Sequence, residues 1–158
     1  MDNQISIRKL VDEDVPMFKK WLYVPHVAKW YHEPMDWIYE VENREKEFHW
    51  LNHFIVECNG NPIGFCQYYE YKNSGETWHG NIELEGTYSI DYLIGEQDYL
   101  KKGHGKEIIN WLVDAISHIP NAKRIIVQPE NENLASCNTL LTNQFSFDTT
   151  NEIFIKTI

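Results

Sequence analysis

Two glycines at the start of a predicted helix form the most informative pattern of this chain. The stretch 99–106 reads Tyr-Leu-Lys-Lys-Gly-His-Gly-Lys and follows an apolar run over 88–95 that is typical of a strand. A helix N-terminus presents unbonded backbone N–H groups and the positive end of the helix dipole, and glycines let a ligand approach that backbone. The pattern therefore favours a bound anion, most often a phosphate. The helix itself is predicted from apolar residues on one face, at Ile108, Ile109, Leu112, Val113 and Ile116.

Two common phosphate-binding motifs do not fit this loop. No Gly-Lys-Ser/Thr follows, which excludes a Walker A loop, and Ile108 occupies the third glycine position of the dinucleotide motif G-x-G-x-x-G. A glycine pair at a helix start can also serve only a turn or close packing. This alternative stays open.

A carboxylate inside an apolar strand is the second chemical signal. Asp91 lies in the middle of a run that predicts a strand over 87–94. Burying a carboxylate is costly unless it has a partner or a function. Next to an amine, such a group can hold the ammonium form and accept or relay its proton. The alternative is that Asp91 lies on a solvent-facing side of the strand.

Composition narrows the class of partner. The 158 residues include 14 Lys and Arg against 24 Asp and Glu, so the formal charge is −10. This excess of acids argues against a nucleic-acid partner and favours a cationic substrate. Six Trp, nine Tyr and seven Phe exceed what a small core usually needs, so we expect some of these rings to line a pocket.

Metal, disulfide and membrane signals are weak. Cys58, Cys66 and Cys137 follow no ligand or disulfide spacing, and His49 and His53, four residues apart, lack a third ligand, so we expect no metal site. The N-terminal residues are polar, unlike a signal peptide, and no apolar run reaches the length of a membrane span. We expect a cytoplasmic protein without membrane contact.

Hydrophobic periodicity predicts the elements that must position these groups. We expect helices after the acidic turn 12–14, from Pro25 onward with Val27, Trp30 and Tyr31, over about 37–50, after the glycine loop, and over 133–143. We expect a hairpin turn at 59–62, a polar loop over 72–85, and strands at about 5–7, 54–56, 63–69, 87–94, 124–127, 145–147 and 153–155. The order predicts a single α/β domain over residues 1–158, with a mixed central sheet flanked by helices.

This order, together with the glycine loop, resembles the GCN5-related N-acetyltransferase (GNAT) family. The pyrophosphate loop of that family reads Arg/Gln-x-x-Gly-x-Gly/Ala; Gly103 and Gly105 match it, and Leu100 departs from it. Within the family the chain resembles the aminoglycoside 6′-N-acetyltransferases most. The resemblance is also carried by Trp21-Leu22, Pro25-His26-Val27, Trp30-Tyr31, Pro62 to Phe65 with Gln67 and Tyr69, Gly86 to Leu93, Pro129, Asn133-Leu134 and Phe145.

The resemblance implies acetyl-CoA as cosubstrate and a GNAT-like fold. Backbone groups near Leu93 and Ile94 would then pair with the pantetheine arm, and an N–H group around Leu93 would bind the thioester oxygen. Asn133 would contact the cofactor, with a helix N-cap as its alternative role. Loop N–H groups would hold the pyrophosphate, at Lys101, Lys102, Gly103, His104, Gly105 and Lys106.

The resemblance also implies an amine site. Asp91 would face the acceptor amine, and Trp30 and Tyr31 would form an aromatic wall for a sugar ring or a cation, unless they pack a helix on the core. Gln67 and Tyr69 are weaker candidates for the pocket. The carboxylates expected nearest to it are those of Glu70, Glu83, Glu85 and Asp91.

Two positions depart from the aminoglycoside enzymes. Gln128 stands where they have an acidic substrate contact, and we include it among the substrate-binding candidates. Leu140 stands where many relatives have a tyrosine that acts as general acid near the thiolate. The departure at Gln128 bears on which amine accepts the acetyl group. The departure at Leu140 bears on which group gives a proton to the leaving thiolate.

The sequence thus supports one primary hypothesis and two alternatives. The primary hypothesis is acetyl transfer to a primary amine of a small cationic substrate, with the aminoglycoside 6′-amine and antibiotic resistance as first guess, by a monomer or homodimer. The second is acylation of a siderophore precursor or another lysine-like amine. The third is a non-catalytic acyl-CoA-binding module, which Asp91 argues against and Leu140 argues for.

Overall fold

A computed structural model describes residues 4–158 as a mixed α/β protein, which confirms the predicted fold class and order of elements. Seven strands form one sheet in the order β1-β2-β3-β4-β5-β7-β6. The strands are β1 (Ile5–Lys9), β2 (Leu51–Cys58), β3 (Asn61–Glu70), β4 (Thr87–Ile94), β5 (Arg124–Val127), β6 (Ser146–Asp148) and β7 (Ile153–Thr157). The helices are α1 (Val15–Tyr23), α2 (Pro25–Ala28), α3 (Pro34–Glu42), α4 (His104–Ser117) and α5 (Leu134–Thr142), with short 3-10 turns at Asp12–Asp14, Tyr71–Asn73 and Gln97–Tyr99.

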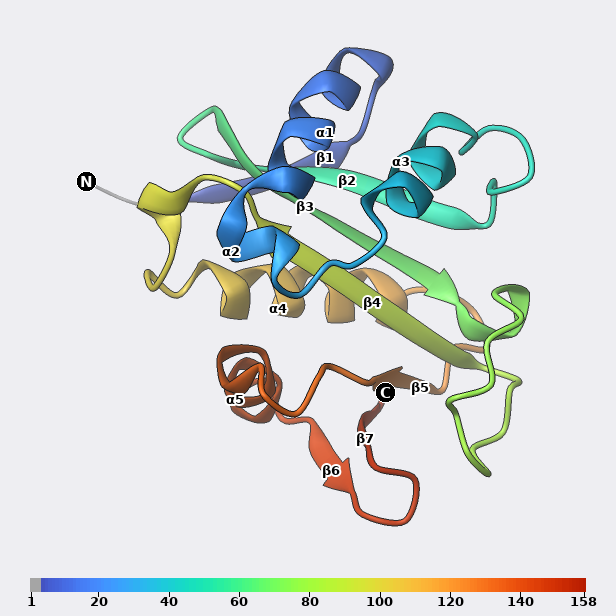
Figure 1. Cartoon of the computed structure of the whole chain (residues 1–158). Coiled ribbons are helices and arrows are strands. Elements are labelled where there is room, and N and C mark those ends of the chain that lie inside the picture. Colours follow the sequence, from blue (N-terminus) through green and yellow to red (C-terminus); the bar gives the residue numbers. More distant parts are fainter. Residues whose placement is uncertain (1–3) are drawn as a thin grey trace. The chain divides into compact units, whose positions relative to one another are not determined.

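The chain forms two compact units, and Figure 1 traces its course through their elements. The first unit contains the chain up to Gln67 together with Tyr92–Gly105. The second contains Tyr68–Asp91 and Lys106–Ile158. The chain therefore passes from one unit to the other three times, within β3, within β4 and at the start of α4, and neither unit is one continuous segment.

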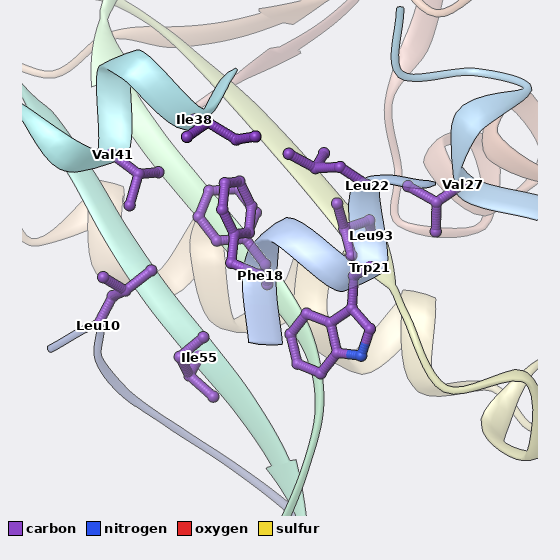
Figure 2. Close-up of a cluster of buried hydrophobic side chains, with 10 residues drawn as sticks. Leu10, Phe18, Trp21, Leu22, Val27, Ile38, Val41, Ile55 and Leu93 are labelled. Atoms are coloured by element: carbon purple, nitrogen blue, oxygen red, sulfur yellow. The ribbon is translucent and has the colours of Figure 1, made fainter. Parts of the chain in front are cut away.

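The first unit is built on the apolar stripe predicted for α1. Phe18, Trp21 and Leu22 are buried, and the rings of Phe18 and Phe65 lie 4.5 Å apart. Figure 2 shows how side chains of the three N-terminal helices meet side chains from the strands in one cluster. Each such buried side chain contributes roughly 1.5–3 kcal/mol of hydrophobic stabilisation. The cluster contains Leu10, Phe18, Trp21, Leu22, Val27, Ile38, Val41, Ile55, Phe65 and Leu93.

Two predicted helices have different bounds in the structure. α2 ends at Ala28, so Trp30 and Tyr31 follow the helix instead of lying on it. α3 begins at Pro34 and ends at Glu42, whereas the prediction was about 37–50. No side chain between Glu42 and Trp50 is fully buried. A helix of that length depends on tertiary packing of an apolar face, and the charged segment 43–50 offers none.

Turn residues account for the predicted hairpin connection at 59–62. Asn59 and Gly60 both have positive φ, 52° and 85°, which is the conformation that a two-residue Asn-Gly hairpin requires. The acidic turn before α1 does not cap that helix through a side chain. The carboxylate of Asp14 accepts from the Val11 N–H at 2.9 Å and from Arg8 at 2.8 Å, and it makes no cap hydrogen bond to α1. Arg8 is also the main cause of the lowered pKa of Asp14.

The second unit contains the parallel pairing of the short strand β5. β5 runs parallel to β4, with Thr87 opposite Arg124 and Tyr88 opposite Ile125, and antiparallel to β7. Its central residues Ile125 and Ile126 are fully buried, as expected for a strand covered on both faces. α4 buries Ile108, Ile109, Leu112 and Ile116, the stripe predicted from the sequence.

Candidate active site

The glycine loop has an open backbone at the entrance of α4. Lys101 and Gly103 have positive φ, 60° and 83°, and both are exposed. A Cβ atom placed on Gly103 would meet nothing within 4 Å. The helix that follows has 14 residues, long enough for a full dipole at its N-terminus. These features suit an anionic group such as a pyrophosphate at the loop.

Gly105 has a packing role in addition to its place in the motif. A Cβ atom there would lie 3.2 Å from the Tyr92 hydroxyl oxygen, closer than ordinary contact. His104 is almost fully buried, with its ring 6.0 Å from that of Tyr99. Its expected contribution to a ligand is therefore its backbone N–H. Lys101, Lys102 and Lys106 are exposed and add positive charge around the loop.

In the first unit, the Trp30 ring already contacts a cationic side chain. The ammonium nitrogen of Lys29 lies 4.9 Å from the centroid of the Trp30 ring, which is a cation–π contact. Trp30 itself is half-buried. The ring therefore can attract an ammonium group, as its proposed place in a cation-binding wall requires.

Tyr31 is engaged differently from its neighbour. Its ring packs edge-on against Trp37, with centroids 5.0 Å apart, and its hydroxyl donates a hydrogen bond to the backbone oxygen of Tyr92. The side chain thus contacts the β4 backbone and the helical cluster. These contacts are the ones expected if Tyr31 packs on the core, which was the alternative to its place in an aromatic wall.

In the second unit, the Tyr69 phenol lies among carboxylates. Its hydroxyl donates to the Glu76 side chain at 3.0 Å. Burial raises the pKa of Tyr69, and the negative charges of Asp91 and Glu76 raise it further, so the phenol stays protonated at neutral pH. Asp91 itself is half-buried on β4. Two carboxylates around one buried hydroxyl form a site that a cationic amine would neutralise.

Glu76 is a candidate site residue that was not among the glutamates expected nearest the pocket. Of those glutamates, Glu70 and Glu85 both pair with Lys72, at 3.4 Å and 3.1 Å. For Glu83, it is the backbone oxygen that accepts a hydrogen bond from Arg124, at 3.2 Å. Glu76 lies in an irregular loop, where no periodic pattern shows which side chain turns back toward β3.

Gln67 lies in the core of the first unit. Its side chain is 2% exposed, next to the buried ring of His53. Burial, together with the charge of Arg44, lowers the pKa of His53 to about 4, and the Gln67 amide opposes this shift. Very little of Gln67 is therefore open to a ligand in this structure. A contact between Gln67 and the substrate stays a prediction.

Three further predicted positions lie in the second unit. Asn133 is the N-cap of α5, because its side-chain oxygen accepts from the Ser136 N–H at 3.2 Å. The N-cap role is thus confirmed, and a contact with the cofactor stays a prediction. Gln128 is exposed directly after β5. Leu140 is buried on α5, so the position of the family's tyrosine holds an apolar core residue.

Residues 4–158 contain neither a cluster suited to a metal ion nor a helix suited to span a membrane. This part of the chain has no group of three or more His, Cys, Asp or Glu side chains arranged to hold a metal ion. His49 is exposed after α3, whereas His53 is buried on β2. Within the same residues, no helix has both the length and the apolar composition needed to cross a bilayer. All three cysteines are free thiols.

Comparison with known families gives one match that spans most of the chain. The family model described as an acetyltransferase (GNAT) domain matches residues 10–153. Among curated proteins, aminoglycoside N(6′)-acetyltransferase type 1 of Klebsiella pneumoniae and that of Serratia marcescens are each 26% identical over 141 residues. The matches cover 84% of this chain and 69% of each relative.

Solved structures share the fold at lower sequence identity. Aminoglycoside acetyltransferase AAC(6′)-Ib in complex with coenzyme A and kanamycin superposes with a TM-score of 0.81 at 22% identity, covering 98% of this chain and 95% of that one. Its complex with ribostamycin and coenzyme A gives 0.82 at 23% identity, covering 98% and 93%. An uncharacterized protein of Bacillus halodurans gives 0.78 at 19% identity, covering 97% and 82%.

Proposed function

Because the chain belongs to the GNAT family of acetyl-CoA-dependent N-acetyltransferases, we propose that it acetylates a primary amine of a small cationic substrate. The first candidate acceptor is the 6′-amine of an aminoglycoside, since curated relatives are named for that reaction. The whole chain, residues 1–158, acts as one acetyltransferase domain in this proposal.

The observation that carries the amine site is the buried Tyr69 hydroxyl among the carboxylates of Asp91 and Glu76. Most amines are protonated at neutral pH, and an ammonium nitrogen cannot attack a thioester. Asp91 holds the ammonium and takes up its proton, directly or through water. The neutral nitrogen then forms a bond to the carbonyl carbon of the acetyl group, and the carbon–sulfur bond breaks. The nitrogen, cationic after its attack, loses its second proton to solvent, and the leaving thiolate takes up a proton from solvent, because Leu140 supplies none.

The cosubstrate is placed by the segment from β4 to α4. Backbone N–H groups from Lys101 to Lys106 hold the pyrophosphate, supported by the open backbone at Gly103. The strand end at Leu93 and Ile94 pairs with the pantetheine arm and binds the thioester oxygen. Asn133 is the remaining candidate contact.

The acceptor is held by charge and by stacking. An exposed ion pair with a substrate ammonium contributes about 1 kcal/mol or less. Several weak pairs, including one with Glu76, and a cation–π contact on Trp30 must therefore act together. Gln67, Tyr69 and Gln128 complete the proposed substrate contacts. Tyr31 stays a proposed member of the same aromatic wall as Trp30.

Gln128 favours a second acceptor class. It is exposed and uncharged where the aminoglycoside enzymes have an acid. One carboxylate fewer suits a substrate with fewer ammonium groups, such as a lysine-like or siderophore amine. We therefore keep this acceptor class as the second candidate.

A panel of amines separates the candidates. The protein is mixed with acetyl-CoA and kanamycin, tobramycin, lysine or cadaverine, and free thiol release is followed. We expect turnover with kanamycin and tobramycin at least tenfold above that with the other amines. A preference for lysine or cadaverine would instead support the second acceptor class, the lysine-like or siderophore amines. Coenzyme A binding without turnover of any amine supports the non-catalytic binding module instead.

Location and assembly are part of the same proposal. Three free thiols, two of them buried, fit a reducing compartment such as the cytoplasm. A monomer or a homodimer fits a site that the residues of one chain supply.

A further inference from the structure

A fully buried tyrosine lies at the start of the loop that connects β3 to β4. Tyr71 directly follows β3 and opens the 3-10 turn Tyr71–Asn73, and no part of it is exposed. Burying an unpaired hydroxyl group is costly, so a buried tyrosine usually has a hydrogen-bond partner. The partner here is the far side of the same loop, because the His79 backbone N–H donates to the Tyr71 hydroxyl oxygen at 3.1 Å. Tyr71 therefore closes the loop.

Two aromatic rings from the far side of the loop pack on the Tyr71 ring. The Trp78 ring lies edge-on to it, with centroids 4.9 Å apart and an angle of 88° between the planes. The His79 ring lies at 5.2 Å, and its Nδ1 atom is 3.3 Å from the Tyr71 hydroxyl oxygen. Edge-to-face pairs stabilise beyond the burial of their surface. Several groups thus join Tyr71 to the far side of the loop, and the hydroxyl is one of them.

The near side of the loop is held by the Tyr71 backbone. The Tyr71 backbone oxygen accepts from the Ser74 N–H at 3.0 Å and from the Ser74 hydroxyl at 2.7 Å. The Ser74 hydroxyl oxygen in turn accepts from the Glu76 N–H at 3.1 Å. Between them, Gly75 has φ +74°, a conformation that favours glycine. The Glu76 backbone is therefore tied to Tyr71 on one side by Ser74 and on the other by the contacts of residues 78 and 79.

Glu76 is the point where this loop meets the proposed amine site. Its carboxylate accepts from the Tyr69 hydroxyl at 3.0 Å, and the negative charge of Asp91 acts on the same hydroxyl. Tyr69 is buried, whereas Glu76 is exposed, so a substrate can reach the Glu76 carboxylate. All of these residues belong to the second unit. The direction of the Glu76 side chain thus depends on the fold of the loop that Tyr71 closes.

We infer that Tyr71 is a positioning residue for the acceptor, because the loop that it closes holds the Glu76 carboxylate beside the Tyr69 hydroxyl. Asp91 then serves the amine that reacts, and Glu76 serves a second ammonium group of the same acceptor. A carboxylate that is fixed in advance loses less conformational freedom when an ammonium group binds. The role toward the acceptor rests on the proposed function, whereas the closure of the loop concerns the protein alone.

The closure of the loop is tested without any substrate. Amide hydrogen exchange of His79 and Glu76 is followed by NMR in Tyr71→Phe, which keeps the buried ring and removes only the hydroxyl. The control is Tyr39→Phe, which removes a surface hydroxyl contact to Glu47 at 3.0 Å and should match the wild type. Loss of one hydrogen bond should make exchange of both amides about 2- to 10-fold faster in Tyr71→Phe. Glu76 is the decisive position, because the substitution leaves its own acceptor in place, and unchanged exchange there would refute closure by Tyr71.

Steady-state kinetics test the role toward the acceptor, with whichever amine of the panel is turned over. Tyr71→Phe should raise the KM of the amine about 2- to 5-fold with kcat unchanged, the size expected for loss of an exposed ion pair, and Tyr39→Phe should change neither. Glu76→Gln should have the same effect, and the double variant should be no worse than Glu76→Gln alone, because both changes remove one contact. An unchanged KM, a lowered kcat or additive effects in the double variant would overturn the inference. If no amine is turned over, the proposed function fails, whereas the exchange data still decide whether Tyr71 closes the loop.

Discussion

A side chain at Gly103 should block the cosubstrate while sparing the fold. Gly103 has φ +83° and open space around the position of a Cβ atom, and Gly60 in the β2–β3 hairpin has φ +85° and the same open space. Asparagine tolerates positive φ better than other residues with a side chain. Gly103→Asn and Gly60→Asn should therefore carry the same small cost in unfolding free energy, about 1 kcal/mol or less. Only the first places atoms where the pyrophosphate is proposed to lie.

The expected loss of affinity follows from the contacts removed. A hydrogen bond to a charged group contributes about 1.5–3 kcal/mol, so displacing the pyrophosphate from one such N–H should raise the Kd of coenzyme A by roughly 10- to 100-fold. Titration calorimetry with coenzyme A measures this, and urea unfolding checks that the two variants are equally stable. If both variants bind coenzyme A within twofold of each other, the loop is a turn without a ligand and the reasoning is refuted.

Three further perturbations probe the amine site and the core. Asp91→Asn should lower kcat/KM by about 10²-fold with the Kd of coenzyme A unchanged, and near-normal turnover would make Asp91 structural. Trp30→Ala should raise the KM of the amine by about 2- to 30-fold through loss of cation–π attraction, as Michaelis–Menten kinetics would show; an unchanged KM places the substrate elsewhere. His53 stays neutral in the fold down to pH about 4 but gains a proton below about 6.5 when unfolded, so its contribution is complete above pH 6.5 and is lost as the pH falls toward 4. Relative to His53→Leu, the wild type should lose about 3 kcal/mol of unfolding free energy in urea between pH 7 and pH 4, with the exposed His118→Leu as control; parallel pH curves would contradict the burial argument.

The sequence was sufficient for elements with strong periodicity. α1 and α4 appear where apolar spacing predicts them, since their buried stripes match the helical period, and β4 appears where a continuous apolar run predicts a strand. The sequence did not predict the end of α3, because tertiary packing sets that boundary. The charged residues between 43 and 50 are good helix formers, yet α3 ends at Glu42. It ends there because no residue from 42 to 50 is buried against the core.

The candidate site residues also divide into those that the sequence indicated and those that it did not. Gly103 and Asp91 stand out because their types conflict with their surroundings, a flexible residue at a helix start and a carboxylate in an apolar strand. Glu76 and His26 carry no such signal. Glu76 lies in an irregular loop without periodicity, so its contact with the Tyr69 hydroxyl leaves no pattern in residue types. The partner of His26, the Ile94 backbone oxygen, is 68 residues away in sequence, and a side chain that binds backbone leaves no such pattern either.

Mapping the product is the most direct measurement of the central claim. The protein is incubated with acetyl-CoA and kanamycin, and the acetylated nitrogen is located by two-dimensional NMR of the purified product. The account predicts one acetyl group on the 6′-nitrogen, one thiol released for each product molecule, and a strongly reduced rate with Asp91→Asn. Unmodified kanamycin, under conditions where a lysine-like or siderophore amine is acetylated, would contradict the assignment of the acceptor, and no acetylated amine of any kind would contradict the enzymatic activity itself.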